Sequence, residues 1–219
     1  MAAPWFPDPR LAGPEGLVAV GGDLSPGRLL AAYRAGIFPW PHPGLPLAWF
    51  SPDPRGVLEF DRLHVPRSLA AARRKTRFAF SIDRAFPAVI AACRSVPRPG
   101  QRGAWLTPAM ERAYLELHRL GLARSAEAWA GERLVGGIYG VAYDGCFSGE
   151  SMFHLETGAS KLALLSLVDA LRSRGLAWMD IQMLTPHMEL LGARAIPRSD
   201  FLDLLARTRA LSLPPRSNK

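Results

Sequence analysis

The dipeptide Asp144-Gly145 constrains the fold of this chain more strongly than any other feature of the sequence. Asp-Gly favours the two-residue turn of a β-hairpin, in which both positions need positive φ. The flanking runs 134–143 and 146–153 are therefore predicted to be paired antiparallel strands. A third strand is predicted over 125–129, so the sequence indicates a meander of three strands.

The residues after the hairpin predict a helix, a short strand and two further helices. Apolar residues recur at spacings of three and four through 160–174, and Gly175 ends that helix. The apolar run 178–182 is the predicted strand. Strands followed by helix, strand and helix indicate an α+β (mixed α/β) domain over residues 61–219. That order resembles the acetyltransferase-like (GNAT) fold, with residues 1–60 as a small N-terminal domain.

Other segments carry signals for the start of a helix or for a strand. Strands are predicted at 17–20, 56–63 and 78–82, and the Pro- and aromatic-rich residues 37–54 are predicted to form an ordered loop. Pro66 is expected to open a basic helix, and the last helix is expected over 200–211. Four residues that cap helix N-termini well precede apolar periodic runs: Ser25, Asp83, Thr107 and Thr185.

Charge is distributed unevenly along the chain. The formal net charge is +8, of which residues 1–103 carry +7 and residues 104–219 carry +1. The densest basic stretch includes Arg67, Arg73, Arg74 and Lys75. A segregated basic face attracts polyanions, and Arg binds phosphate through two donors at once. The stretch therefore indicates a nucleic-acid surface, against the alternative of a merely solvated face.

The sequence lacks the features that are typical of membrane proteins, of secreted proteins and of metal-binding proteins. No apolar run reaches the length of a membrane span, and the first residues lack the pattern of a signal peptide. Cys93 and Cys146 are too few for a disulfide framework, so we expect reduced, buried thiols in a cytoplasmic protein. We also expect a monomer that needs no metal and no cofactor.

The strand 178–182 carries two polar residues at alternate positions. Asp180 and Gln182 should point to one face of the strand, between the inward-packing Met179, Ile181 and Met183. A carboxylate and an amide are costly to bury without partners. They indicate either a catalytic pair or a structural polar pair that is satisfied by a neighbouring loop.

Glu150 lies in the stretch 149–153 that ends the second hairpin strand, close in sequence to the apolar helix at 160–174. An acid beside an apolar pocket can act as a base or bind a cationic group. The alternatives are a helix cap or a pair with an arginine. Trp40 and Trp105 stand at loop edges, where they could stack on unpaired bases or anchor the loops in the core. The turn 155–161 has one glycine and a glutamate, which disfavours coenzyme A.

Seven stretches, in order along the chain, resemble the leucyl/phenylalanyl-tRNA–protein transferase family. They are GGDLSPGRLLAAYRAGIFPW (21–40), WFSPDPRGVL (49–58), LVGGIYGV (134–141), GESMF (149–153), ASKLALL (159–165), MDIQ (179–182) and LGARAIPRSDFL (191–202). The resemblance implies a small N-terminal domain on an acetyltransferase-like domain, without coenzyme A. An enzyme that uses acyl-CoA and a non-catalytic RNA-binding module remain as alternatives.

The resemblance also implies the reaction. Leucine or phenylalanine, and methionine less well, would pass from aminoacyl-tRNA to the α-amine of proteins that begin with Lys or Arg. The product would be degraded by the N-degron pathway of a bacterial cytoplasm.

The resemblance assigns roles to residues of this sequence. Asp180 and Gln182 would be catalytic, with Glu150 near the reacting groups. Trp40 and Trp105 would hold the terminal adenosine of the tRNA, and Arg67, Arg73, Arg74 and Lys75 would meet its acceptor stem. The pocket for the leucine or phenylalanine side chain matches Ile138, Met152, Leu164, Leu167, Leu171 and Met179.

Overall fold

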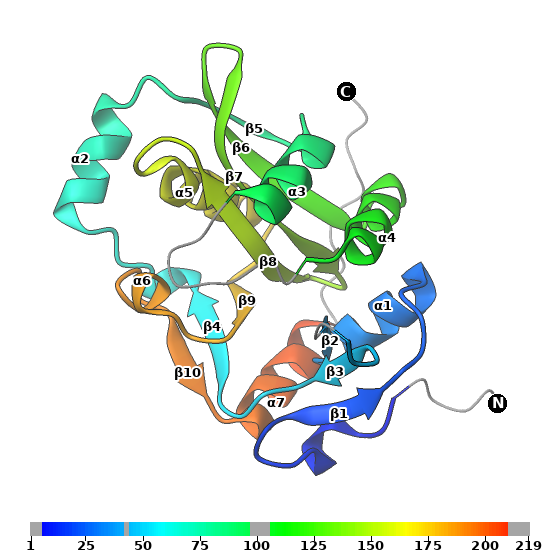
Figure 1. The fold of residues 1–219 in the computed structure, drawn as a ribbon. Coiled ribbons are helices and arrows are strands. Elements are labelled where there is room, and N and C mark those ends of the chain that lie inside the picture. The colour runs from blue at the N-terminus through cyan, green and yellow to red at the C-terminus, as the bar shows by residue number, and fades with distance from the viewer. Residues whose placement is uncertain (1–5, 42–43, 97–105, 210–219) are drawn as a thin grey trace.

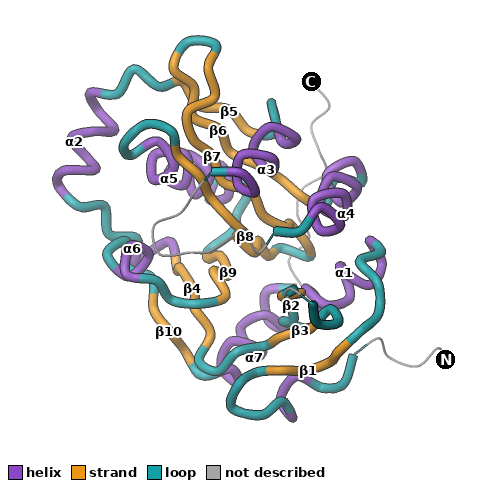
Figure 2. The backbone as a smooth tube through the Cα atoms, in the orientation of Figure 1, coloured by secondary structure: helices purple, strands orange, loops and turns teal. Residues whose placement is uncertain are grey.

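The protein was analysed as a computed structural model, which describes residues 6–41, 44–96 and 106–209. A seven-stranded sheet forms its centre, in the order β10-β4-β9-β8-β7-β6-β5, and a three-stranded sheet with the order β1-β3-β2 lies beside it. Figures 1 and 2 show the large sheet between helices, with the small sheet and α7 at its lower end.

The strands of the large sheet are β4 (Arg55–Glu59), β5 (Ala79–Ile82), β6 (Ala123–Ala130), β7 (Arg133–Tyr143), β8 (Cys146–His154), β9 (Trp178–Gln182) and β10 (Arg194–Ile196). Those of the small sheet are β1 (Leu17–Val20), β2 (Phe38–Trp40) and β3 (Ala48–Phe50). The α-helices are α1 (Pro26–Arg34), α2 (Arg67–Lys75), α3 (Phe86–Ser95), α4 (Pro108–Arg119), α5 (Ala159–Arg172), α6 (Pro186–Glu189) and α7 (Arg198–Thr208). Short 3-10 helices span Pro9–Leu11 and Phe60–Arg62.

The hairpin that the sequence predicts joins β7 to β8. Tyr143 pairs with Cys146, and the two turn residues have positive φ, 41° at Asp144 and 79° at Gly145. Arg34 of α1 donates two hydrogen bonds of 2.7 Å to the Asp144 carboxylate. The turn is thus tied to the N-terminal part of the chain.

Two hydrophobic clusters cover the two faces of the large sheet. Alternate residues of β7 enter different clusters: Ile138 packs with α5, and Tyr139 packs with α3 and α4. The cluster that holds Tyr139 also contains Leu29 and Trp49 from the N-terminal segment. One core therefore joins the small sheet to one face of the large sheet.

The mixed α+β arrangement is confirmed, whereas the acetyltransferase-like fold stays a prediction. The division at residue 60 also stays a prediction, and β4, which precedes it, is a strand of the large sheet. None of the described helices is both long enough and apolar enough to cross a membrane.

Several local predictions were wrong. Asp83 does not cap α3, which follows Ala85; with φ of 59°, the Asp83 carboxylate instead accepts a hydrogen bond of 2.8 Å from the Ser125 backbone N–H. The predicted loop 37–54 contains β2 and β3. The strand predicted over 56–63 ends at Glu59, and the last helix begins at Arg198 rather than at residue 200.

The neighbours of β9 create the space for a site. β8 and β9 run parallel but share a single paired position, Ser148 with Asp180, and then separate. On the other side β4 pairs antiparallel with β9, with an irregularity between Gly56 and Val57, opposite Gln182 and Asp180. The end of β9 therefore departs from regular strand geometry.

Candidate functional site

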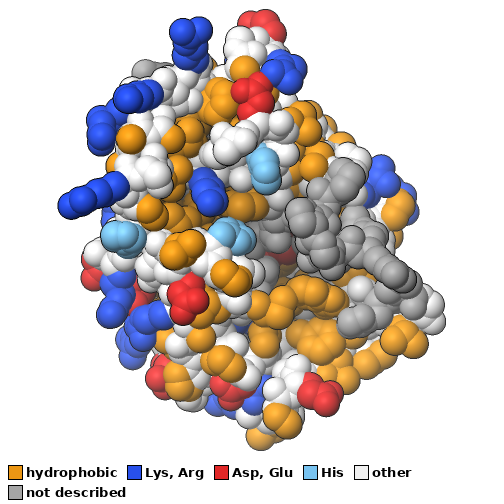
Figure 3. All heavy atoms as spheres, turned by 60° about the vertical axis from the view of Figure 1, so that its left-hand side comes forward, with side chains coloured by type: hydrophobic (Ala, Val, Ile, Leu, Met, Phe, Trp, Pro, Cys, Tyr) orange, Lys and Arg blue, Asp and Glu red, His pale blue; other side chains and the backbone are white. Residues whose placement is uncertain are grey.

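A cavity of about 650 Å³ lies where β8 and β9 separate. Figure 3 shows hydrophobic side chains around the hollow in this face, with Lys or Arg and His side chains along one rim. The described residues that line the cavity are Phe38, Pro39, Trp40, Val96, Ile138, Gly149, Glu150, Ser151, Met152, Phe153, His154, Ser160, Lys161, Met179, Ile181, Gln182, Met183, Thr185, His187 and Met188.

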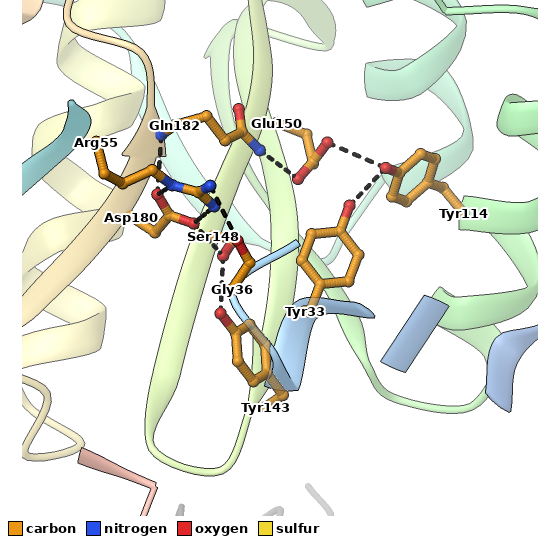
Figure 4. A network of polar contacts seen from close by, with 9 residues as sticks. All are labelled: Tyr33, Gly36, Arg55, Tyr114, Tyr143, Ser148, Glu150, Asp180 and Gln182. Carbon is orange, nitrogen blue, oxygen red and sulfur yellow. Dashed lines mark hydrogen bonds and ion pairs between the residues drawn. The ribbon is translucent and has the colours of Figure 1, made fainter. Parts of the chain in front are cut away.

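Asp180 of β9 is held by a buried arginine beside the cavity. Arg55 of β4 donates to both carboxylate oxygens, at 2.9 and 2.7 Å, and both side chains are 1 % exposed. Ser148 donates a third hydrogen bond of 3.0 Å, and the backbone N–H of Gln182 a fourth of 2.9 Å (Figure 4). Four donors satisfy the hydrogen-bonding capacity of this buried carboxylate. Asp180 therefore holds the backbone around Gln182 in place.

Gln182 stands in an unusual backbone conformation at the end of β9. Its φ is +60°, and the N–H of Met183 donates to the carbonyl of Ile181 at 2.7 Å. An i→i+2 hydrogen bond around a residue with positive φ defines the rarer, strained form of the γ-turn. Such strain persists only where neighbouring contacts enforce it. Here the Asp180 carboxylate supplies one of those contacts.

Gly56 of β4 supplies the room for this turn. A Cβ on Gly56 would come within 2.9 Å of the Leu184 nitrogen and of the Met183 carbonyl carbon. Real Cβ atoms are essentially never found so close to other heavy atoms. Consecutive residues of β4, Arg55 and Gly56, thus fix the end of β9.

The side chain of Gln182 points to Glu150 and away from Asp180 (Figure 4). Its Nε2 donates to Glu150 Oε1 at 2.7 Å, and Tyr114 of α4 donates to Oε2 at 3.0 Å. The hydroxyl of Tyr33, from α1, lies 2.6 Å from that of Tyr114. Burial raises the pKa of both tyrosines well above the usual range, so both stay protonated.

Glu150 titrates near neutral pH. Burial raises the pKa of its carboxyl to about 7, while hydrogen bonds from Tyr33, Tyr114 and Gln182 oppose the rise and the charge of Asp180 adds to it. A carboxyl whose pKa lies near the working pH suits a general base. Of the described residues that line the cavity, Glu150 is the only carboxylate.

A family model described as leucyl/phenylalanyl-tRNA protein transferase matches residues 57–206, and a model of the N-terminal domain of the same transferases matches 22–53. The chain belongs to the leucyl/phenylalanyl-tRNA–protein transferase family. It is therefore an aminoacyltransferase.

Three relatives of that name cover most of the chain. The transferase of Nitratidesulfovibrio vulgaris (strain DP4) is 54 % identical over 200 residues, 91 % of this chain and 86 % of the relative. That of Anaeromyxobacter dehalogenans (strain 2CP-C) is 52 % identical over 204 residues, 93 % and 88 % of the two chains. That of Xanthomonas euvesicatoria is 49 % identical over 217 residues, 99 % and 87 %.

The transferase resemblance assigned six apolar residues to a side-chain pocket, and the structure separates them into two groups. Ile138, Met152 and Met179 line the cavity. Leu164, Leu167 and Leu171 do not line it; they are at most 4 % exposed and belong to the same hydrophobic cluster behind it. Their assignment to the transferase pocket remains a proposal.

The residues assigned to tRNA lie in different parts of the molecule. Trp40 lines the cavity beside Phe38, whereas Trp105 falls outside the described residues. The four basic residues Arg67, Arg73, Arg74 and Lys75 belong to α2 and do not line the cavity. Arg73 pairs with Asp169 of α5.

The prediction that Asp180 and Gln182 project together was wrong, because the γ-turn breaks the alternation of the strand. Met183 is 44 % exposed rather than packed inward for the same reason. Arg55, Tyr33 and Tyr114 were missed because their partners are far away in the sequence. The one available signal was an arginine in an otherwise apolar run, 55–58.

Within the described ranges, no three His, Cys, Asp or Glu side chains are grouped as metal ligands.

Proposed function

We propose that this protein transfers leucine or phenylalanine, and methionine less well, from charged tRNA to the α-amine of proteins that begin with Lys or Arg. The products would be degraded by the N-degron pathway in the bacterial cytoplasm. Membership of the transferase family supports the reaction class. The observation that carries the mechanism is the hydrogen bond between Gln182 and Glu150 at an apolar cavity.

The apolar wall of the cavity is the proposed site for the side chain of the transferred amino acid. Ile138, Met152 and Met179 offer hydrophobic contacts and no polar partners. A charged side chain would lose its hydration there without compensation. Flexible methionines adapt to side chains of different shape, which fits acceptance of leucine, phenylalanine and methionine.

Glu150 is the proposed general base. The α-amine of a protein has a pKa of about 7.7–8.0. Proton transfer from its ammonium to a carboxylate of pKa about 7 therefore costs only about 1 kcal/mol. Asp180 is less suitable, because Arg55 and Ser148 occupy its oxygens and it does not line the cavity.

Gln182 is the proposed holder of the attacking amine. An ionised Glu150 accepts the Nε2–H of Gln182, so the Oε1 of that amide is left to accept a hydrogen bond. An amine N–H directed to Gln182 Oε1 would lie next to the base. Positioning of this kind is what an already activated ester mainly requires.

The proposed chemical steps balance without a cofactor. The amine nitrogen attacks the ester carbonyl, the bond between that carbonyl and the terminal ribose oxygen breaks, and an amide forms. The ammonium first loses one proton through Glu150 to solvent, and the second proton, lost when the amide forms, passes through Glu150 to the departing ribose oxygen. The negative charge of Glu150 also favours acceptors with a cationic first residue.

A transfer assay tests this function. We expect radiolabelled leucine to pass from leucyl-tRNA to an Arg-starting acceptor protein, and Glu150→Gln to lower kcat by about 10²- to 10⁴-fold. Gln182→Ala should also lower kcat, because it removes the side chain that holds the amine. Asp180→Asn should lower kcat too, because it disturbs the backbone of Gln182. Normal rates in all three variants would refute the mechanism. Binding of charged tRNA without any transfer would refute the function.

A further inference from the structure

The residues that line the cavity fall into three chemical groups. Phe38 and Trp40 form an aromatic group, and the apolar group is the one described above. Ser160, Lys161 and His187 form a polar and basic group, to which the proposed function gives no role.

The basic side lies at the beginning of α5. Gly158, with φ of 82°, is the N-cap of this 14-residue helix, and Ser160 and Lys161 stand in its first turn. The helix dipole favours an anion at this end. Glu156, which would repel one, forms an ion pair with Arg133. The nearest acidic side chain along the chain is thus already neutralised.

Two side chains on this side are available for a ligand. Ser160 is 6 % exposed and lines the cavity, and its hydroxyl has no hydrogen-bond partner among the residues that the structure describes. A hydroxyl without a protein partner at a cavity wall can donate to a ligand oxygen. Lys161 is exposed, and no carboxylate in the described ranges forms an ion pair with it.

His187 adds a neutral donor to this group. Burial lowers the pKa of His187, and the charge of Lys161, which lines the same cavity, lowers it further. Its Nδ1 lies 3.2 Å from the hydroxyl of Thr185. When Thr185 donates to Nδ1, the imidazole carries its proton on Nε2 and can donate to a ligand oxygen.

We propose that Ser160, Lys161 and His187 bind the phosphodiester that joins the 3′-terminal adenosine of the donor tRNA to the preceding nucleotide. This inference rests on the proposed function. Three groups are attached to the terminal ribose: the base, the aminoacyl ester and the 5′-phosphate. The aromatic, apolar and basic groups of the cavity lining provide one matching set of contacts for each, so the phosphate contact would fix the ribose relative to the other two.

Donors of increasing length test the subsite. Leucyl-adenosine has no phosphate, the leucyl ester of cytidylyl-adenosine has one, and leucyl-tRNA has the whole backbone. We expect Lys161→Met to raise KM about tenfold for the dinucleotide and for the tRNA, while kcat changes little. It should also reduce the salt dependence of log KM by about 0.7 for the dinucleotide. The KM for leucyl-adenosine should stay within twofold of the wild-type value.

Arg207→Met is the matched control. Arg207 is an exposed cation on α7 that does not line the cavity, so this variant removes the same charge elsewhere. It should leave the KM for the dinucleotide unchanged. An equal loss with Arg207→Met, an equal loss with leucyl-adenosine, or no loss with the dinucleotide would each overturn the subsite.

Binding of uncharged ligands separates this proposal from the proposed function. Calorimetry with cytidylyl-adenosine and with adenosine measures the affinity that the phosphate adds. Lys161→Met should abolish that difference, even if the wild-type protein transferred leucine from no donor. A difference that survives the substitution would overturn the subsite while leaving the transferase reaction intact.

Discussion

At the scale of single residues, burial sets the ionisation of Glu150 first, and hydrogen bonds from neighbouring side chains partly oppose it. Tyr114 donates to the carboxylate directly, and Tyr33 stands behind it. Both bonds favour the anion, whereas burial favours the neutral acid. The two tyrosines therefore adjust a base that burial alone would leave too weakly ionised at neutral pH.

Tyr114→Phe should move the pH profile of transfer. Loss of the hydroxyl removes a donor to the Glu150 carboxylate, so its pKa rises from about 7 and less base is ionised at pH 6.5. A hydrogen bond to a charged group contributes about 1.5–3 kcal/mol, so the acid limb of kcat/KM should move up by about one pH unit. Tyr143→Phe is the control, because Tyr143 contacts Ser148 instead. A limb that stays in place in Tyr114→Phe would exclude Glu150 as the titrating base.

The sequence indicated some site residues and not others. Asp180, Gln182 and Glu150 stand out because they interrupt apolar strands. The partner of Asp180 does not, because Arg55 lies 125 residues earlier and reaches it only through sheet pairing. Backbone strain at Gln182 leaves no mark in the sequence either, since it is imposed by contacts with other strands.

At the scale of elements, the end of β9 depends on its neighbour β4. The γ-turn at Gln182 fits only because Gly56 has no side chain, and Arg55 holds Asp180 in place beside it. An edge-to-edge contact between two strands thus determines where the amide of Gln182 lies.

Gly56→Ala should therefore reduce transfer without unfolding the protein. The added Cβ would meet Met183 and Leu184 at 2.9 Å, so the turn must shift and Gln182 must move with it. Displacements of about 1 Å can cost about 10²-fold in rate, so we expect kcat to fall by at least tenfold while the circular dichroism spectrum is retained. Gly27→Ala in α1, where nothing lies within 4 Å, should leave kcat unchanged. Full activity of Gly56→Ala would show that the turn does not position Gln182.

Long elements were predictable, and short ones were not. The hairpin, α5 and β9 have strong local signals in turn chemistry and apolar spacing. The three-residue strands β2, β3 and β10 are too short for any periodicity and exist because neighbouring strands pair with them. The sequence predicts a helix cap at Asp83 because a suitable residue before a helix looks the same whether it binds that helix or a distant strand.

At the scale of the whole molecule, Arg55 joins the small sheet to the large one. It donates to the carbonyl of Gly36 at 3.0 Å, and its guanidinium lies over the rings of Phe38 and Phe201 at 4.9 and 4.4 Å. Since a single hydrophobic cluster also spans both sheets, we expect the described chain to unfold as one unit.

Arg55→Met tests this cooperativity. The substitution leaves Asp180 buried without its cation, which typically costs about 3–5 kcal/mol. For a chain of this size the Tm should fall by about 10 °C in calorimetry, in one transition. Arg10→Met, which breaks an exposed pair with Asp203, should change the Tm by less than about 4 °C. A second, separate transition would contradict a single folding unit.

The contacts of Arg55 have an evolutionary consequence. From Gly36 and Phe38 to Asp180 and then Gln182, each group touches the next, so the N-terminal segment reaches the reacting groups in a few steps. Selection for higher stability and selection for a higher rate of transfer therefore act on the same small set of side chains.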